Sequence, residues 1–109
     1  MYRRGAVWMA DLPDVSRKPA VIVSSRLVTL KLNPIVARIT SVARERTIET
    51  VVPLDHGEIE GLPDASFVLG HDIYTLSDGG LVEHLGWLQA DRMTQVEEAV
   101  LRALGVELS

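Results

Sequence analysis

The chain has 109 residues, a hydrophobic fraction of 47% and a net charge of −4. This length and composition suit one domain with its own hydrophobic core, so we expect a single domain over residues 1–109. The absence of cysteine and the unpaired spacing of the three histidines argue against disulfides, thiolate chemistry, a structural metal or another cofactor. No signal-peptide core and no apolar run of membrane-spanning length is visible, which predicts a cytoplasmic protein.

The charge is divided unevenly along the chain. Residues 1–46 hold nine of the eleven Lys and Arg residues against three acids, a net charge of +6, whereas residues 47–109 have a net charge of −10. A polyanion responds to local potential more than to net charge. The sequence therefore predicts a basic, nucleic-acid-binding face on an acidic protein. The alternative is that these Lys and Arg side chains only solubilise exposed loops.

Hydrophobic and alternating segments predict six short strands at residues 6–12, 20–24, 34–40, 48–54, 66–70 and 85–88. Pro19 suits a strand entrance because it lacks an N–H, and it holds Lys18 in an extended conformation just outside that strand. Residues 26–32 are ambiguous and compatible with one helical turn. Residues 72–76 continue or bend the fifth strand.

The third strand is expected to bring two polar side chains together. Period-two alternation places Ile35, Ala37 and Ile39 on one face and Val36, Arg38 and Thr40 on the other. The guanidinium of Arg38 and the hydroxyl of Thr40 should therefore point the same way.

Residues 90–104 form the one convincing helix, with an apolar stripe of Met93, Val96, Val100, Ala103 and Leu104. We expect this stripe to be fully covered, and Gly105 to end the helix. Short strands with one terminal helix predict a mainly β protein, a small barrel, because parallel crossovers would need more helices.

With these elements in place, several motifs show a family resemblance: RGAVWMADL at 4–12, KPAVIVSS at 18–25, ITS at 39–41 and DIYTL at 72–76. The chain resembles the MazF/PemK (Kid)-type toxins, mRNA endoribonucleases of bacterial type II toxin–antitoxin systems. The resemblance implies an SH3-like barrel of the CcdB/Kid type and a homodimer. It also implies metal-independent, sequence-specific cleavage of single-stranded mRNA, and inhibition by a cognate antitoxin that is acidic and partly disordered.

Catalytic residues are inferred mainly from this resemblance. Lys18 resembles the cation that holds the scissile phosphate, with Arg17 as an alternative, and Thr40 resembles the threonine whose hydroxyl contacts that phosphate. The family usually has arginine where this chain has Lys18 and Tyr74, and usually a longer first loop, so catalytic competence is inherited less safely than the fold. Asp14 is the only carboxylate in the first loop and is a candidate general base.

The remaining candidates concern RNA binding. The residues expected to contact the RNA strand are Arg38, Ser41, Arg4 and Asp14. His71 and Asp72 are candidate acid–base groups, but a polar pair at a strand end is the better interpretation, and His56 and His84 are expected at the surface. Trp8 and Trp87 could stack on bases, but such residues are more often core or interface anchors.

The reaction expected from this set is attack by the RNA 2′-hydroxyl, which leaves a 2′,3′-cyclic phosphate and a 5′-hydroxyl. One alternative is a CcdB-like toxin that poisons DNA gyrase on the same fold. Another is a cleavage-dead member that only binds RNA or antitoxin.

Overall fold

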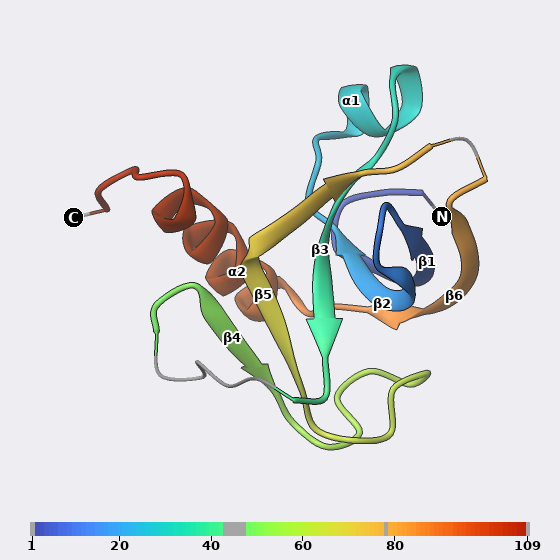
Figure 1. Ribbon diagram of the computed structural model, residues 1–109. Helices are drawn as coiled ribbons and strands as arrows, with labels where there is room; N and C mark the ends of the chain where they lie inside the picture. The colour runs from blue at the N-terminus through green and yellow to red at the C-terminus, as the bar shows by residue number, and fades with distance from the viewer. Residues whose placement is uncertain (1, 43–47, 78, 109) are drawn as a thin grey trace.

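The computed structural model describes residues 2–42, 48–77 and 79–108. Its elements are β1 (Ala6–Leu12), β2 (Ser16–Ile22), α1 (Arg26–Lys31), β3 (Ile35–Thr40), β4 (Val51–Leu54), β5 (Ser66–Thr75), β6 (Leu81–Trp87) and α2 (Ala90–Ala103). The strands pair antiparallel in one sheet of order β4-β5-β3-β2-β1-β6 (Figure 1). The predicted mainly β fold with a C-terminal helix is therefore confirmed.

The sheet curls until its β6 edge meets the loop of residues 55–65, which joins β4 to β5. The Gly61 N–H donates a 2.8 Å hydrogen bond to the Leu85 carbonyl on β6, and a Cβ at Gly61 would lie 2.8 Å from the Leu85 Cβ. A glycine is needed for this approach, because any side chain would overlap β6. The 55–65 loop thus completes the small barrel on this side, since β4 and β6 do not pair within the described part of the chain.

Both faces of the sheet are buried. The face beneath α2 holds one apolar cluster, which includes Val7, Val21, Ala37, Ile39, Val68, Val96 and Ala99. The other face holds a second cluster, which includes Ala6, Trp8, Ala10, Ala20, Ile22, Val36 and Leu76. Ala37 and Ile39 lie in the first cluster and Val36 in the second, which confirms the predicted alternation of the third strand.

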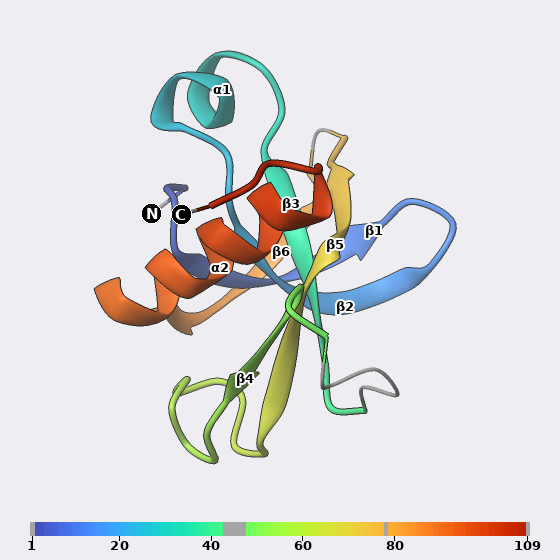
Figure 2. The ribbon, with the colours of Figure 1, turned by 90° about the vertical axis from the view of Figure 1, so that its left-hand side faces the viewer.

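Helix α2 packs against β5 and β4 (Figure 2). Met93, Val96 and Ala99 are its buried residues, and Gly70 of β5 lies so close that a Cβ there would be 2.8 Å from the Ala99 Cβ. The predicted stripe is wrong at its end, where Ala103 and Leu104 are exposed, because the contacts of the helix with the core end at Ala99 and Val100. Gly105 has φ +85° and follows the end of the helix, as predicted.

Three strands, β2, β4 and β6, begin three or four residues from their predicted starts, and β5 continues through residues 72–75. β2 begins at Ser16 because it forms a hairpin with β1, in which Leu12 pairs with Ser16 around a turn that holds Asp14 at φ 60°. β4 begins only at Val51. β6 begins earlier than predicted, at Leu81, and its exposed, partly polar edge hid it from a search for apolar runs. The predicted helical turn is confirmed as α1, where the Ser25 hydroxyl accepts a hydrogen bond from the Val28 N–H.

Candidate functional site

A cavity of about 270 Å³ opens where β2 and β3 separate. We call it the β2–β3 pocket. Its lining residues are Lys18, Pro19, Arg38, Ile39, Thr40, Ser41, Leu62, Pro63, Asp64 and Ser66. Strand ends therefore form one side, and residues 62–66, which we call the pocket wall, form the other.

Pro19 explains why the strands separate at this point. The Val23 N–H, just beyond the end of β2, donates to the Ile35 carbonyl, so alternation also places the main-chain groups of Val21 and Pro19 of β2 toward β3. Pro19 has no N–H to donate to Ile39, and pairing of β2 with β3 stops one residue earlier, at Ala20 and Arg38. Pro19 was expected at a strand entrance; it lies instead inside β2, opposite Met9 of β1.

Lys18 and Arg38 are the cations of this pocket. Lys18 is half-buried and forms no ion pair with any described residue. The Arg38 Nη1 lies 3.7 Å from the Asp72 Oδ2, and its Nε is buried without a hydrogen-bond partner among the described residues. Burial, followed by a hydrogen bond to Asp72, raises the pKa of Tyr74, the third member of this group. Of these two cations, Lys18 is therefore the one whose charge no described carboxylate offsets.

Thr40 and Ser41 lie at the end of β3 and line the same pocket. The Thr40 hydroxyl donates to the Val42 carbonyl at 2.9 Å and is 3.2 Å from the Val42 N–H, which donates to it. This local turn holds the hydroxyl in place as the chain leaves the strand. An anion in the pocket would have to compete with the Val42 carbonyl for the hydroxyl proton.

Three predicted site residues lie outside the pocket. Arg17 faces away from Lys18, as expected for neighbours in a strand, and its Nε lies 2.8 Å from the Asp11 Oδ1. Their contact raises the pKa of Arg17 and lowers that of Asp11. Arg4 donates to the Val23 carbonyl and pairs with Glu97 of α2. Asp14 is exposed in the β1–β2 turn.

The pocket wall and Asp72 were missed as parts of the site. The sequence marks residues 55–64 only as turn-forming, and this pattern gives no sign that Leu62, Pro63 and Asp64 face Lys18 across a cavity. Asp72 was set aside as part of a polar strand-end pair, yet it contacts Arg38 because the two strands pair around an irregularity between Ala37 and Ile39.

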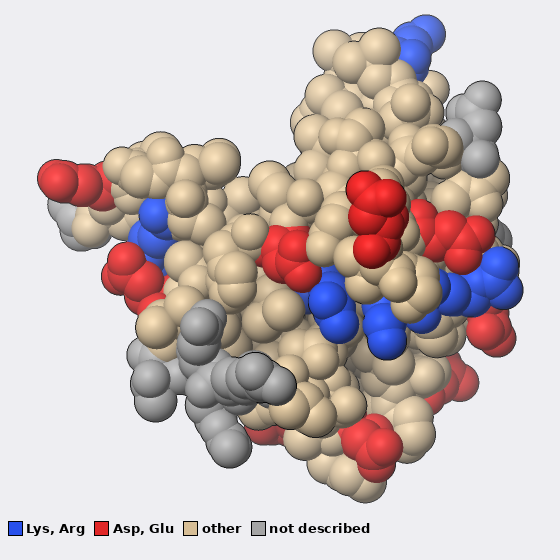
Figure 3. Space-filling view, viewed as in Figure 1, with Lys and Arg blue, Asp and Glu red and all other residues tan. Residues whose placement is uncertain are grey.

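Within the described residues, the cations of the basic half do not gather into a single face; Arg44 and Arg46 lie outside those residues. Figure 3 shows a row of basic side chains across the middle of one face, bordered by acidic groups. Lys18, Arg38 and Arg17 belong to the region of β2 and β3, whereas other cations lie elsewhere: Arg26 and Lys31 on α1, and Arg3 with its guanidinium 4.8 Å from the centre of the Trp87 ring. The described cations of the predicted basic face therefore form only a narrow strip (Figure 3), which we call the basic strip.

Aromatic rings form a row across β1 and β6. Ring centres are 5.0 Å apart for Tyr2 and Trp8, 5.2 Å for Trp8 and His84, and 5.1 Å for His84 and Trp87. Trp8 is a core residue at 5% exposure, as expected. His84 was expected at the surface; its side chain is half-buried, with its Nε2 buried and its ring in contact with both tryptophans.

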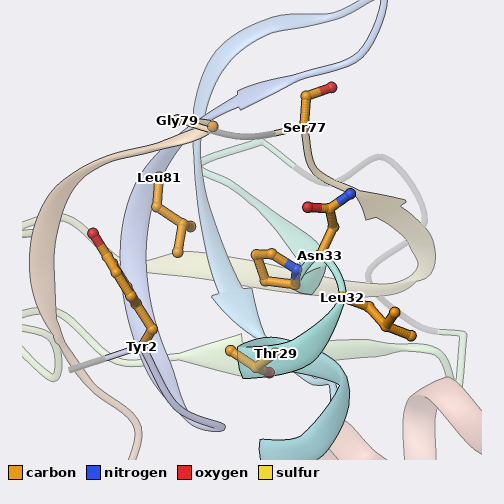
Figure 4. Close-up of a pocket in the computed structure, with 9 residues that line it drawn as sticks. Tyr2, Thr29, Leu32, Asn33, Ser77, Gly79 and Leu81 are labelled. Atoms are coloured by element: carbon orange, nitrogen blue, oxygen red, sulfur yellow. The ribbon is translucent and has the colours of Figure 1, made fainter.

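A second cavity, of about 170 Å³, lies at the opposite end of β3 (Figure 4). Tyr2 and Leu81 lie on one side of it and Asn33 and Ser77 on the other, and α1 contributes Thr29. It has no cation in its lining, so it offers an anion less than the β2–β3 pocket does.

The described residues contain no group of three or more side chains suited to hold a metal ion. His71, for example, has its Nδ1 2.8 Å from the Thr50 hydroxyl. Neither helix in the described ranges is long and apolar enough to cross a membrane.

Residues 3–104 match the sequence profile of PemK-like, MazF-like toxins of type II toxin–antitoxin systems. The chain belongs to this family. Among solved structures, an endoribonuclease from a mycobacterial species in complex with its cognate antitoxin is 28% identical, with a TM-score of 0.81 and 98% of each chain covered. The Mycobacterium tuberculosis toxin MazF-mt6 is 27% identical, with a TM-score of 0.79 over 94% of this chain and 99% of that one.

Another mycobacterial endoribonuclease is 27% identical, with a TM-score of 0.78 over 98% of this chain and 94% of that one. Nearly the whole length of each neighbour is therefore matched. The MazF-like fold of the chain and the sequence-based recognition of the family are both confirmed.

Proposed function

We propose that this MazF-like toxin is an endoribonuclease that cleaves single-stranded mRNA at specific sequences, without a metal ion, through the β2–β3 pocket. The observation that supports this most is the convergence of four predicted residues, Lys18, Arg38, Thr40 and Ser41, in one cavity of a chain from this family. They come from two strands and from both sides of the gap at Pro19.

In the proposed reaction the RNA supplies its own nucleophile. The 2′-oxygen attacks the adjacent phosphorus, its proton leaves to a base, and the bond to the 5′-oxygen breaks as that oxygen gains a proton. The products are a 2′,3′-cyclic phosphate and a 5′-hydroxyl. The protein must therefore stabilise a phosphorane with extra negative charge, which cations and hydroxyl donors in a partly enclosed site do well.

Each pocket residue has a role in this proposal. Lys18 holds the scissile phosphate as a point charge, and Thr40 donates to it after releasing the Val42 carbonyl. Arg38 and Ser41 bind the RNA strand at the pocket. Arg17 and Arg4, which lie outside the cavity, could contact only more distant parts of the RNA. Asp14 as a general base would need RNA to extend to the β1–β2 turn, so we assign no proton acceptor.

We further propose a cytoplasmic homodimer that is inhibited by an acidic, partly disordered antitoxin. Two features support self-association. In the described structure no strand pairs with the outer edge of β6, which receives only the hydrogen bond from Gly61 at Leu85. Val82 and Trp87 of β6 and the nearby Tyr2 are 41%, 39% and 50% exposed. The basic strip would attract an acidic segment that folds on binding. Light scattering that finds only monomer at micromolar concentration would refute the dimer.

Incubation of a long single-stranded RNA with the purified protein in excess EDTA tests the reaction. We expect discrete cuts that carry 5′-hydroxyl ends, mapped by ligation that requires such ends. Loss of cleavage in EDTA with recovery in magnesium would refute the metal-independent mechanism. RNA binding without cleavage would indicate a cleavage-dead member, and gyrase inhibition without either would indicate the CcdB-like alternative. The endoribonucleases among its structural neighbours favour RNA cleavage over that alternative.

A further inference from the structure

The 55–65 loop is fastened at several points between β4 and the pocket wall. Ile59 is 2% exposed and belongs to the core beneath α2. The Gly57 N–H donates to the Pro63 carbonyl at 3.1 Å, and the Gly61 N–H bonds to β6 as described above. These contacts hold the middle of the loop against the barrel.

The most heavily bonded of these points is an ion pair between the loop and α2. The Arg92 Nε lies 2.9 Å from Oε2 and 3.2 Å from Oε1 of Glu58, and the two side chains are only 20% and 14% exposed. The Arg92 Nη2 donates to Asp55 at 3.3 Å and its Nη1 to Gln95 at 3.0 Å, while the Glu58 Oε1 also accepts from the Asp55 N–H at 2.9 Å. One guanidinium thus joins two loop residues to the helix.

This ion pair lies outside the β2–β3 pocket, but the loop it fastens continues directly into the pocket wall. Leu62, Pro63 and Asp64 follow Glu58 within six residues and face Lys18 and Thr40 across the cavity. Half-buried charged hydrogen bonds of this kind hold a segment more firmly than exposed ion pairs do. A displacement of the loop would therefore change the width of the cavity.

We infer that Arg92 is a positioning residue for the β2–β3 pocket, because through Glu58 it fixes the wall against which RNA is held. The expected effect on RNA cleavage rests on the proposed function, whereas the expected effect on the loop does not. Arg92 touches no RNA in this scheme. It acts at a distance, from the first turns of α2, on the side of the cavity opposite the phosphate-binding cation.

The test uses three variants: Arg92→Gln, Glu58→Gln and the double variant that carries both changes. Each is compared with the control variant Arg102→Gln. Arg102 is a matched control, since it pairs with Glu49 and Glu98 at 3.7 Å each at the other end of α2 and does not contact the wall. The substrate is a short RNA containing a cleavage site mapped with the wild type. We expect KM to rise about tenfold with kcat nearly unchanged in the first three variants, because the wall binds substrate and transition state alike.

The double variant should be no worse than either single variant, because both act through one contact. Amide hydrogen exchange of residues 58–64 should accelerate in the three loop variants and not in Arg102→Gln. If the glutamine variants do not fold, Arg92→Lys replaces them. Lysine keeps the positive charge but lacks the planar guanidinium that bonds both oxygens of Glu58, so KM should rise by less than in Arg92→Gln.

Unchanged KM and exchange, or an equal rise in KM for Arg102→Gln, would overturn the inference. If the wild type cuts no RNA, the proposed function fails by itself. The positioning role is then decided by amide exchange alone, which needs no substrate.

Discussion

Replacement of Lys18 is the most direct test of the pocket. Lys18 lines the cavity beside Thr40 and is free of ion pairs among the described residues, whereas the charge of Arg38 is partly offset by Asp72. Lys18→Ala should therefore remove most of the available positive charge, and Lys18→Arg should keep or raise activity because a guanidinium can form two parallel bonds to phosphate.

The size of the effect follows from one lost contact. A hydrogen bond to a charged group stabilises by about 1.5–3 kcal/mol. A tenfold change in rate corresponds to about 1.36 kcal/mol, so kcat/KM of Lys18→Ala should fall by about 10- to 150-fold. The barrel should stay intact, because a half-buried lysine side chain contributes little to the core.

The assay is initial-rate cleavage of the mapped RNA in EDTA, with thermal unfolding measured in parallel. Arg17→Ala is the matched control: it removes a neighbouring cation that faces away from the cavity and pairs with Asp11, and we expect a change of less than about threefold. Equal activity of wild type, Lys18→Ala and Lys18→Arg would refute the assignment. A larger loss in Arg17→Ala would move the phosphate site to the other side of β2.

Three further predictions concern the turn, the helix contact and pH. Thr40→Ala should lower kcat by about 100-fold or more, while Thr40→Ser, which keeps the hydroxyl and its bonds to the chain, should retain most activity. Gly70→Ala should destabilise the fold by about 1–3 kcal/mol, measured by denaturant unfolding, because the added Cβ would lie 2.8 Å from the Ala99 Cβ. Burial and Asp72 raise the pKa of Tyr74, so the stability that its neutral form contributes is present below the unfolded pKa near 10 and lost as pH rises through the folded pKa. Asp72→Asn should lower the pKa of Tyr74 in an ultraviolet titration.

Each of these has a result that contradicts it. Full activity of Thr40→Ala would remove its hydroxyl from the reaction. Gly70→Ala with unchanged stability would mean that α2 shifts freely on β5, whereas partial recovery in Gly70→Ala with Ala99→Gly would support direct overlap. A tyrosinate titration unaffected by Asp72→Asn, recorded in a Tyr2→Phe background so that Tyr74 alone reports, would leave burial as the whole cause.

Much of the architecture was accessible from local patterns. The alternation in residues 35–40 predicts correctly which β3 side chains face α2, and Gly105 correctly marks the end of the last helix. Strand bounds were less accessible where pairing overrides apolar patterning. β2 extends back to Ser16 because β1 supplies partners for its polar residues, and the β6 edge tolerates exposed residues that no search for buried strands would select.

The candidate site was accessible only in part for a related reason. Lys18, Arg38, Thr40 and Ser41 lie on or beside strands, so period two and the family resemblance locate them. The pocket wall comes from a loop more than twenty residues further along the chain, and its placement depends on Arg92, Gly61 and Ile59 acting together. The sequence pattern also does not show that Arg17 pairs with Asp11 and Arg4 with Glu97, because these ion pairs depend on which strands and helix come together in the fold.

The gap at Pro19 leaves a main-chain acceptor at the β2–β3 pocket. Because Pro19 offers no donor, the Ile39 main-chain carbonyl that faces it receives no hydrogen bond from β2. A backbone carbonyl of this kind can accept a hydrogen bond from the amino group of an RNA base, whatever side chains surround it. With alanine in place of Pro19, β2 and β3 would form one more hydrogen-bonded pair, and the cavity between them would become narrower. A single ring in the backbone thus acts as the stop that keeps the end of a sheet open to a ligand.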